Sequence, residues 1–216
     1  MVIWMNNKKP AEPQVDKEHY YDGYDSKSRF CSYWHQIDEV KEINPESILE
    51  IGVGNKFVYD YLDKYGFNIS SIDIDADLNP DYQGSVLGLP FDTNDFELIL
   101  CCEVLEHIPF EKFEIAIQEL KRVAEKYIII SLPHSSSHYR FQLQIPKLGE
   151  IKFLFPIPLP NRFKPKHEFD GEHYWEIGKR GYPLKKIVNT VEKYGLDIRK
   201  NYRVFEKKHR FFIIEI

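Results

Sequence analysis

The chain has 216 residues, which is enough for one domain with a sizeable core and too few for two comfortable ones. An apolar content of 43%, with 15% aromatic residues, excludes a disordered chain. The net charge of −5 is divided unevenly: residues 1–150 hold 14 Lys and Arg against 26 Asp and Glu (−12), and residues 151–216 hold 15 against 8 (+7). The basic last third suits an anionic substrate, a membrane surface or a solvated lysine-rich face, and no nucleic-acid-binding motif accompanies it.

The three cysteines, of which Cys101 and Cys102 are adjacent, do not form a disulfide framework. Reduced thiols are typical of a cytoplasmic protein, and we expect that location. The sequence shows no charged segment followed by the long apolar run of a secretory leader, and no run of 18 apolar residues. We therefore expect neither secretion nor a membrane span.

Residues 1–19 are polar and interrupted by prolines, which predicts a loosely held terminus. From Ser28 to Ile43, apolar side chains recur every three or four residues, so we expect an amphipathic helix ahead of the first strand. Asn44 and Pro45 then end that helix.

The next stretch has the order strand, tight turn, helix. Residues 47–51 are a short apolar run, Gly52 and Gly54 follow, and the helical pattern of residues 55–65 begins directly after them. This order forms the nucleotide-binding corner of doubly wound α/β sheets, where glycines let a ligand approach the backbone. Phe57 stands where a dinucleotide fingerprint has its third glycine, which argues against a nicotinamide cofactor.

A second apolar run, Ile69–Asp73, ends in a carboxylate about 20 residues after the glycines. A carboxylate at this place can accept hydrogen bonds from both hydroxyls of a ribose. Residues 82–86 predict a short third strand. Residues 96–101 form a continuous apolar run of the kind that is buried on both faces of a parallel sheet.

Residues 111–126 have an apolar side at helical spacing, and residues 127–132 form the next buried strand. Four strand–helix units in succession indicate an α/β fold with a mostly parallel sheet. A helix that ends at Tyr194 and two strands, residues 196–205 and 210–216, follow later.

Residues 138–170 interrupt this alternation of strands and helices. Apolar side chains recur along the segment, and five prolines fall from Pro146 to Pro165, which argues against a regular central strand. The segment follows the fifth strand, on the crevice side of the predicted sheet. Three hypotheses stay open for it: a lid over the crevice, a flap that touches a partner or a membrane, and plain packing.

Four motifs occur in register along the middle of the chain: Glu50–Gly54, Ser71–Asp75, Leu89–Glu97 and Glu103–His107. Together they resemble a class I S-adenosylmethionine-dependent methyltransferase of the methyltransferase domain 11 type, over roughly residues 45–135. The resemblance implies a doubly wound, mostly parallel seven-stranded sheet with an antiparallel C-terminal hairpin. It also divides one domain, 1–216, into an N-terminal extension and covering helix (1–44), a cofactor-binding core (45–135), a lid-like insertion (136–180), and a closing helix and hairpin (181–216).

The resemblance implies S-adenosyl-L-methionine as the cofactor and assigns it a set of binding residues. These are Glu50, Gly52, Gly54, Asn55, Asp73, Ile74, Ser85, Val86, Cys101 and Cys102. Ile74 is expected against the adenine, and the small Cys101 and Cys102 beside the methionine portion. Ser85 stands where relatives commonly have an acid, and the backbone N–H of Val86 is expected to serve the adenine.

A leading helix often covers the cofactor in the resembled family, and Tyr20, Tyr24 and Arg29 lie just before or on it. Arg29 then either pairs with the carboxylate of the cofactor or lies at the surface. His107 is expected to hydrogen-bond to the local backbone of its turn rather than to take part in catalysis.

Methyl transfer from a sulfonium is an in-line displacement, in which the acceptor is held roughly 3–3.5 Å from the methyl carbon and water is excluded. Histidine suits proton removal from a hydroxyl acceptor near neutral pH, so His134, His138 and His173 are candidate bases, each with a structural role as the alternative. No H-x-x-x-H or paired C-x-x-C spacing occurs, and we expect no metal. Three aromatic residues are candidates for an acceptor wall or a cation–π contact: Tyr139, Tyr174 and Trp175.

Two main hypotheses follow from the resemblance. In the first, the chain is an enzyme that transfers a methyl group to a small, partly apolar acceptor. In the second, it binds S-adenosylmethionine as a regulatory or interaction protein without turnover, which Lys56 and Ser85 motivate. A nicotinamide-dependent enzyme is a weaker third. The expected partners are a small-molecule acceptor and, weakly, a membrane surface, with no nucleic acid and with the oligomeric state left open.

Overall fold

The structure, a computed structural model, describes residues 13, 15–21 and 23–216, so most of the predicted loose terminus lies outside the described residues. The helices are α1 (Lys27–Ile43), α2 (Phe57–Lys64), α3 (Phe113–Val123) and α4 (Leu184–Lys193). The strands are β1 (Ile48–Ile51), β2 (Ile69–Asp73), β3 (Tyr82–Gln83), β4 (Phe96–Cys102), β5 (Ala124–Pro133), β6 (His138–Ile145), β7 (Gly149–Pro156), β8 (Asp197–Arg203) and β9 (His209–Glu215). Short 3-10 turns include η1 (Lys17–Tyr20), η2 (Ala76–Leu78), η3 (Leu105–His107), η4 (Phe110–Lys112) and η5 (Asn161–Phe163).

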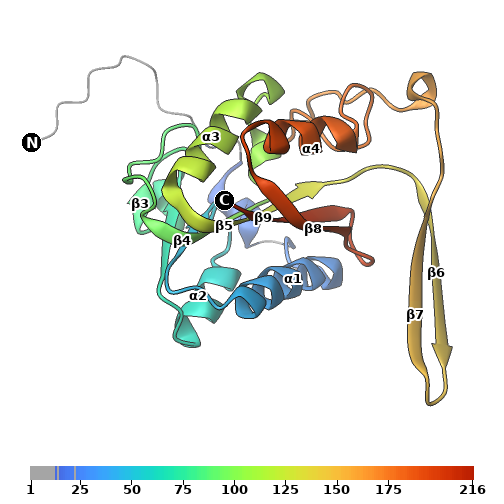
Figure 1. Cartoon of the computed structure of the whole chain (residues 1–216), viewed down its shortest axis with the longest axis horizontal. Helices are drawn as coiled ribbons and strands as arrows, with labels where there is room; N and C mark the ends of the chain where they lie inside the picture. The colour runs from blue at the N-terminus through green and yellow to red at the C-terminus, as the bar shows by residue number, and fades with distance from the viewer. Residues whose placement is uncertain (1–12, 14, 22) are drawn as a thin grey trace, which may run out of the picture.

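Seven strands form one sheet in the order β3-β2-β1-β4-β5-β9-β8. Strands β1 to β5 are parallel to their neighbours among themselves, whereas β9 is antiparallel to both β5 and β8. Helices α1 and α2 cover one face of the sheet, and α3 and α4 cover the other (Figure 1). The predicted fold is therefore confirmed: a doubly wound, mostly parallel seven-stranded sheet that ends in an antiparallel hairpin.

The central strands are buried on both faces, as their continuous apolar runs predict. In β4, Leu98 and Leu100 belong to the core on the side of α1 and α2, whereas Ile99 belongs to the core on the side of α3 and α4. Strand β5 alternates in the same way. Because successive side chains of a strand point to opposite faces, one apolar run contributes to two cores.

Helix α1 begins and ends where its flanking residues dictate. The hydroxyl of Ser26 accepts a hydrogen bond from the backbone N–H of Arg29 at 3.2 Å and caps the first turn. At the other end, Asn44 adopts a left-handed conformation with φ 51°, and Pro45 follows. The cap places Arg29 in the first turn of the helix, beside the cavity described below.

Two predicted elements are shorter than expected. Strand β3 covers the first two of the five residues predicted for it, because the chain turns at Ser85, whose carbonyl accepts a hydrogen bond from the N–H of Gly88 at 3.0 Å. Helix α3 is shorter at both ends, since a 3-10 turn precedes it and β5 begins directly after it.

Strands β6 and β7 form a separate antiparallel hairpin, which extends away from the sheet (Figure 1). Pro146 lies in its turn and Pro156 at the end of β7, so neither interrupts the ladder. The register puts apolar side chains opposite one another on one face: Tyr139 with Phe155, Phe141 with Phe153, and Leu143 with Ile151. Across the described ranges, we find no helix that is both long and apolar enough to cross a membrane.

Candidate functional site

A cavity of about 800 Å³ opens at the carboxyl ends of the parallel strands. The loops that follow β1, β2, β4 and β5 line it, which is the edge where open α/β sheets bind ligands. We distinguish two parts of the cavity by their lining residues. The glycine end comprises Gly52, Val53, Gly54 and Asp73, and the histidine end comprises Glu106, His107, His173 and Glu176.

The glycine end is held together by the Asp73 carboxylate, which accepts a hydrogen bond from each of two turns. The backbone N–H of Val53 donates to Oδ2 of Asp73 at 2.9 Å, and the backbone N–H of Asp75 donates to Oδ1 at 2.9 Å. Gly52 has a φ of 82°, and a Cβ at this position would lie 2.4 Å from Cγ2 of Val104, so a larger residue does not fit. The turn after β1 and the carboxylate that ends β2 therefore converge on one part of the cavity.

Lys56 and Phe57, which depart from a glycine-rich pattern, do not block this end. Neither is among the described residues that line the cavity. Lys56 donates from Nζ to the carbonyl of Asn79 at 2.8 Å, and Phe57 stacks on the ring of Tyr33 with centroids 4.8 Å apart. Both side chains are thus used in packing the second helix against its surroundings.

Of the ten residues predicted to bind the cofactor, nine line the cavity: Glu50, Gly52, Gly54, Asn55, Asp73, Ile74, Ser85, Val86 and Cys102. Cys101 instead belongs to the core on the side of α3 and α4. Because adjacent residues of β4 face opposite sides, only Cys102 of the pair reaches the cavity. Contact of these residues with a ligand stays a prediction.

Two acids, the buried Glu50 and the half-buried Asp73, line the cavity. Burial raises the pKa of Glu50 to about 8, against the opposing charge of Lys56, so this carboxyl group keeps its proton at neutral pH. Burial also raises the pKa of Asp73, while the N–H groups of Asp75 and Val53 act to lower it. The two hydrogen bonds thus favour an ionised Asp73 at the point where the two turns meet.

Residues in and just before the first turn of α1 also line the cavity, and Tyr20 among them lies beside Gly54. Tyr20, Tyr24 and Arg29 line the cavity from this side. The guanidinium of Arg29 lies 4.0 Å from the ring centroid of Tyr24, and its buried Nε has no hydrogen-bond partner among the described residues. Burial raises the pKa of Tyr24 to about 12. Arg29 therefore brings to the cavity a positive charge and a buried N–H donor that has no described partner.

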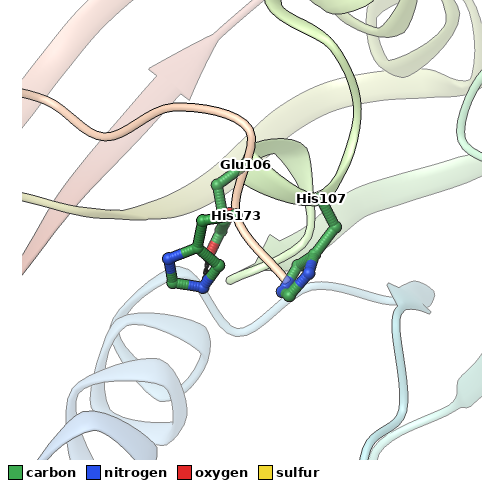
Figure 2. Close-up of side chains that lie close together, drawn as sticks. All are labelled: Glu106, His107 and His173. Atoms are coloured by element: carbon green, nitrogen blue, oxygen red, sulfur yellow. Dashed lines mark ion pairs between the residues drawn. The ribbon is translucent and has the colours of Figure 1, made fainter. Parts of the chain in front are cut away.

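The histidine end combines two segments that are far apart in the sequence (Figure 2). Glu106 and His107 lie in η3, directly after β4, and His173 lies in the loop before α4. Nδ1 of His107 is 3.1 Å from the carbonyl oxygen of Glu172, and Nδ1 of His173 is 3.2 Å from Oε1 of Glu176. Nε2 of His173 is 4.0 Å from Oε1 of Glu106.

Two carboxylates three residues apart, the half-buried Glu103 and the buried Glu106, differ sharply in their partners. Burial acts to raise the pKa of Glu103, but the charge of His209, 3.0 Å away, and a 2.8 Å hydrogen bond from the Ser131 hydroxyl hold it below its usual value. Neither carboxylate oxygen of the fully buried Glu106 accepts a hydrogen bond from a described residue. Burial and then the nearby charge of Glu103 raise the pKa of Glu106 well above its usual value.

The same surroundings shift the pKa values of the histidine side chains. Burial acts to lower the pKa of His173, but the hydrogen bond to Glu176 and the nearby acids raise it. That bond in turn lowers the pKa of Glu176 to about 2. Burial lowers the pKa of His107.

Of the three histidines predicted as bases, His173 lines the cavity, whereas His134 and His138 are not among its lining residues. His134 is buried at the end of β5, where Nδ1 accepts a hydrogen bond from Nε of Arg210 at 3.0 Å. Burial and then the charges of Arg203 and Arg210 lower the pKa of His134 to about 3. His138 lies at the base of the hairpin.

The three predicted aromatic residues lie in three different environments. Tyr174 lines the cavity, next to His173. Trp175 is fully buried in the core, where Nε1 donates to the carbonyl of Ile108 at 3.1 Å. Tyr139 is largely exposed on the hairpin.

Sequence reasoning missed several groups that share the cavity with His173, namely Glu103, Glu106 and His209. His107 was expected to bond to its own turn, yet it bonds to a carbonyl 65 residues along the chain. The available signal was the E-x-x-E-H spacing of Glu103–His107, which puts two acids and a histidine directly after a buried strand. His173 carried no such local signal.

Residues 49–129 match the family model of a methyltransferase domain. None of the curated proteins gives a significant sequence match. Solved structures resemble the chain over most of its length. An S-adenosylmethionine-dependent methyltransferase from Clostridium acetobutylicum has 10% identity and a TM-score of 0.59, with 92% of this chain and 97% of that chain covered.

Two further structures give the same picture. A methyltransferase from Aquifex aeolicus that depends on S-adenosylmethionine has 16% identity and a TM-score of 0.58, with 94% of this chain and 99% of that chain covered. The 1,6-didemethyltoxoflavin-N1-methyltransferase of Burkholderia thailandensis, solved with 1,6-didemethyltoxoflavin and S-adenosylhomocysteine bound, has 11% identity and a TM-score of 0.60. The alignment covers 92% of this chain and 84% of that chain. At these identities the likeness establishes the shared fold.

Proposed function

Because the chain carries a class I S-adenosylmethionine-dependent methyltransferase domain, we propose that it is an enzyme that transfers a methyl group from S-adenosyl-L-methionine to a small, partly apolar acceptor. One observation carries the proposal. The hydrogen bond from Val53 to Asp73 joins the turn after β1 to the carboxylate that ends β2, and both line one cavity at the ligand-binding edge of the sheet.

The residues at the glycine end fit the cofactor. Each oxygen of Asp73 accepts one backbone hydrogen bond, and an ionised carboxylate has about four acceptor positions in all, so two remain for the hydroxyls of a ribose. Gly52 lets the ligand approach the backbone closely. Ile74 and Val86 line the same cavity as Asp73 and provide apolar surface for an adenine.

Arg29 supplies a recognition group for the charged end of the cofactor. Its side chain lines the cavity, and its buried Nε has no hydrogen-bond partner among the described residues. The carboxylate of the methionine portion would satisfy this donor with a charge-assisted hydrogen bond. The cofactor supplies a methyl group on a sulfonium, while Arg29 and the tyrosines beside it shield that group from bulk water.

The histidine end is the place we assign to the acceptor. It lies in the same cavity, where the apolar side chains of Ile108 and Tyr174 accompany its polar ones. His173 is the predicted base that reaches this cavity, and Glu176 fixes its ring through Nδ1. A small acceptor with both an apolar and a polar part suits this lining.

Calorimetric titration with S-adenosylmethionine and S-adenosylhomocysteine tests the proposal. We expect saturable binding of both by the wild-type chain. Asp73→Asn should weaken binding about 10- to 100-fold, because hydrogen bonds to a charged group contribute about 1.5–3 kcal/mol. Asp77→Asn, an exposed residue four positions on that does not line the cavity, is the matched control and should bind like the wild type. Absence of saturable binding by the wild type would overturn the proposal.

A binding protein without turnover is the second candidate. It is motivated by the positions of His134 and His138, which leave His173 as the predicted base that lines the cavity. Mass spectrometry of reactions with a broad panel of hydroxyl, amine and carbon acceptors distinguishes the two. Tight cofactor binding with no methylated product from any acceptor would favour the second candidate.

A further inference from the structure

Three side chains with metal-ligating atoms meet at the histidine end: Glu106, His107 and His173 (Figure 2). One ligand atom from each lies within 4.8 Å of the other two. Ligands at about 2.0–2.2 Å from a metal ion are at most about 4.4 Å from one another. Small side-chain movements would therefore close these three groups around one ion.

The carboxylate of Glu106 is the first independent indication of a cation. Its side chain has no exposed surface, it is aimed into the cavity, and neither oxygen accepts a hydrogen bond from a described residue. A buried polar group without a partner costs free energy, and a buried charge costs more. Two acceptor oxygens in this position suit a ligand that carries positive charge.

The hydrogen bonds of the two histidines are the second indication. A carbonyl oxygen can only accept, so Nδ1 of His107 carries a proton and donates to the carbonyl of Glu172. Nδ1 of His173 likewise faces a carboxylate oxygen of Glu176, whose other oxygen accepts a hydrogen bond from the Ser135 hydroxyl. A carbonyl or carboxylate behind Nδ1 is the arrangement that orients the Nε2 of metal-ligating histidines.

We propose that Glu106, His107 and His173 bind a first-row divalent transition-metal ion through one carboxylate oxygen and two imidazole nitrogens. This ligand set suits such ions, because imidazole binds them well and the hard carboxylate adds charge balance. Three further carboxylates, Glu103, Glu172 and Glu176, line the same cavity, together with five Lys and Arg side chains: Arg29, Lys112, Lys179, Lys207 and Lys208.

A metal ion at this place also restricts the chemical class of the acceptor. This step rests on the proposed function. Three protein ligands leave at least one position of the ion for an oxygen on the cavity side. A hydroxyl bound there would have a lowered pKa and would lose its proton to water, because His173, as a ligand of the ion, would then no longer serve as the base. Its oxygen lone pair then forms the bond to the methyl carbon while the C–S bonding pair returns to sulfur, which gives a methyl ether and S-adenosylhomocysteine. The acceptor is thus a small molecule with a hydroxyl group.

Co²⁺ is the probe, because its visible absorption reports coordination directly. Protein that has been stripped with a chelator and dialysed is titrated with Co²⁺ and followed by absorption and calorimetry. We expect one ion per chain, and at least a tenfold loss of affinity in Glu106→Gln and in His173→Ala. His138→Ala removes an imidazole at the base of the hairpin, outside the cavity-lining residues, and should bind Co²⁺ like the wild type.

Cofactor binding by each variant in the presence of chelator shows that the variant is folded and separates the two proposals. Failure of the wild type to bind Co²⁺ saturably, with S-adenosylmethionine binding intact, would overturn the metal site alone. Undiminished Co²⁺ affinity in both Glu106→Gln and His173→Ala would overturn it as well, since the ion would then lie elsewhere. Stoichiometric Co²⁺ binding that both variants weaken, without cofactor binding by the wild type, would support the site and overturn the proposed function.

Discussion

The two ends of the cavity are built in different ways. At the glycine end, the Asp73 carboxylate accepts one hydrogen bond from a backbone N–H of the turn after β1 and one from a backbone N–H of the turn after β2. At the histidine end, residues from two distant segments meet, and the buried Glu106 has no hydrogen-bond partner among the described residues. The first end is complete as a local motif, whereas the second depends on how a distant loop is held.

Backbone hydrogen bonds hold that loop. The N–H of Tyr174 donates to the carbonyl of Glu106 at 2.9 Å, and the N–H of Ile177 donates to that of Pro133 at 3.0 Å. Between these two points the indole of Trp175 is buried against the rings of Phe110 and Phe113. The position of His173 therefore depends on one large anchor in the core of α3 and α4.

Trp175→Ala should cause the largest loss of stability, because it removes the anchor of the loop at the histidine end. Removal of a fully buried aromatic side chain costs about 3–5 kcal/mol, here with the added loss of the hydrogen bond to the Ile108 carbonyl. Urea unfolding followed by circular dichroism measures this cost. The adjacent Tyr174→Ala, which truncates a more exposed ring, should cost about 1 kcal/mol or less. Equal costs for the two variants would show that Trp175 does not anchor the loop.

Gly52→Ala should have the next largest effect, and it acts at the other end. The new Cβ would meet Cγ2 of Val104 at 2.4 Å with φ at 82°, so backbone strain and overpacking together should cost about 2–4 kcal/mol. Gly66→Ala is the matched control, because its φ is 87° and no atom lies within 4 Å of its Cβ position. The difference in unfolding free energy between the two variants isolates the contact with Val104. A Gly52→Ala cost no larger than that of Gly66→Ala would contradict the close packing of this turn.

The difference in how the two ends of the cavity are built explains which of them could be predicted from the sequence. The fold and the glycine end follow from local patterns: apolar runs of strand length, glycines after β1, and a carboxylate after β2. The histidine end does not, because His173 reaches Glu106 only through the burial of Trp175, which as a sequence letter is equally consistent with an exposed acceptor wall. His134 shows the converse, since a histidine after a buried strand can serve to pack two arginines rather than to face a ligand.

The pH dependence of stability tests the scaffold behind the histidine end, where His134 forms a bridge with Ile177. The pKa of His134 is lowered to about 3 when folded, mainly by burial, whereas an unfolded histidine has a pKa of about 6.5. Between these values the unfolded chain binds the extra proton, so stability is full above about pH 6.5 and falls as the pH drops toward 3.

The contribution of this one group should approach about 1.4 kcal/mol per pH unit. His134→Gln, which keeps an acceptor for Arg210, should remove that slope. The difference between the two unfolding curves, measured from pH 7 to pH 4, cancels the carboxylates that titrate in both proteins. Parallel curves over this range would show that His134 is not held neutral.

Truncation of the hairpin should have the smallest effect. Residues 139–155 contribute to neither described core, and the apolar side chains along one face of β6 and β7 are exposed, with Phe153 at 50% and Phe155 at 53%. An ion pair between the hairpin and the rest of the molecule joins Lys152 to Glu206 at 3.0 Å, and exposed pairs contribute about 0–1 kcal/mol. Replacement of residues 139–155 by an Asn-Gly turn keeps the terminal pair of His138 and Pro156 and closes the ladder.

We expect this truncation to change the unfolding free energy by less than about 1 kcal/mol and the S-adenosylmethionine affinity by less than about twofold, because the described residues that line the cavity include none from 139–155. The Michaelis constant for an acceptor is the measurement that bears on the predicted lid. An increase in that constant, with cofactor affinity unchanged, would support a lid that closes over the histidine end during the reaction. Loss of cofactor binding would instead mean that the hairpin supports the glycine end, and the two ends could then no longer be treated as separately built.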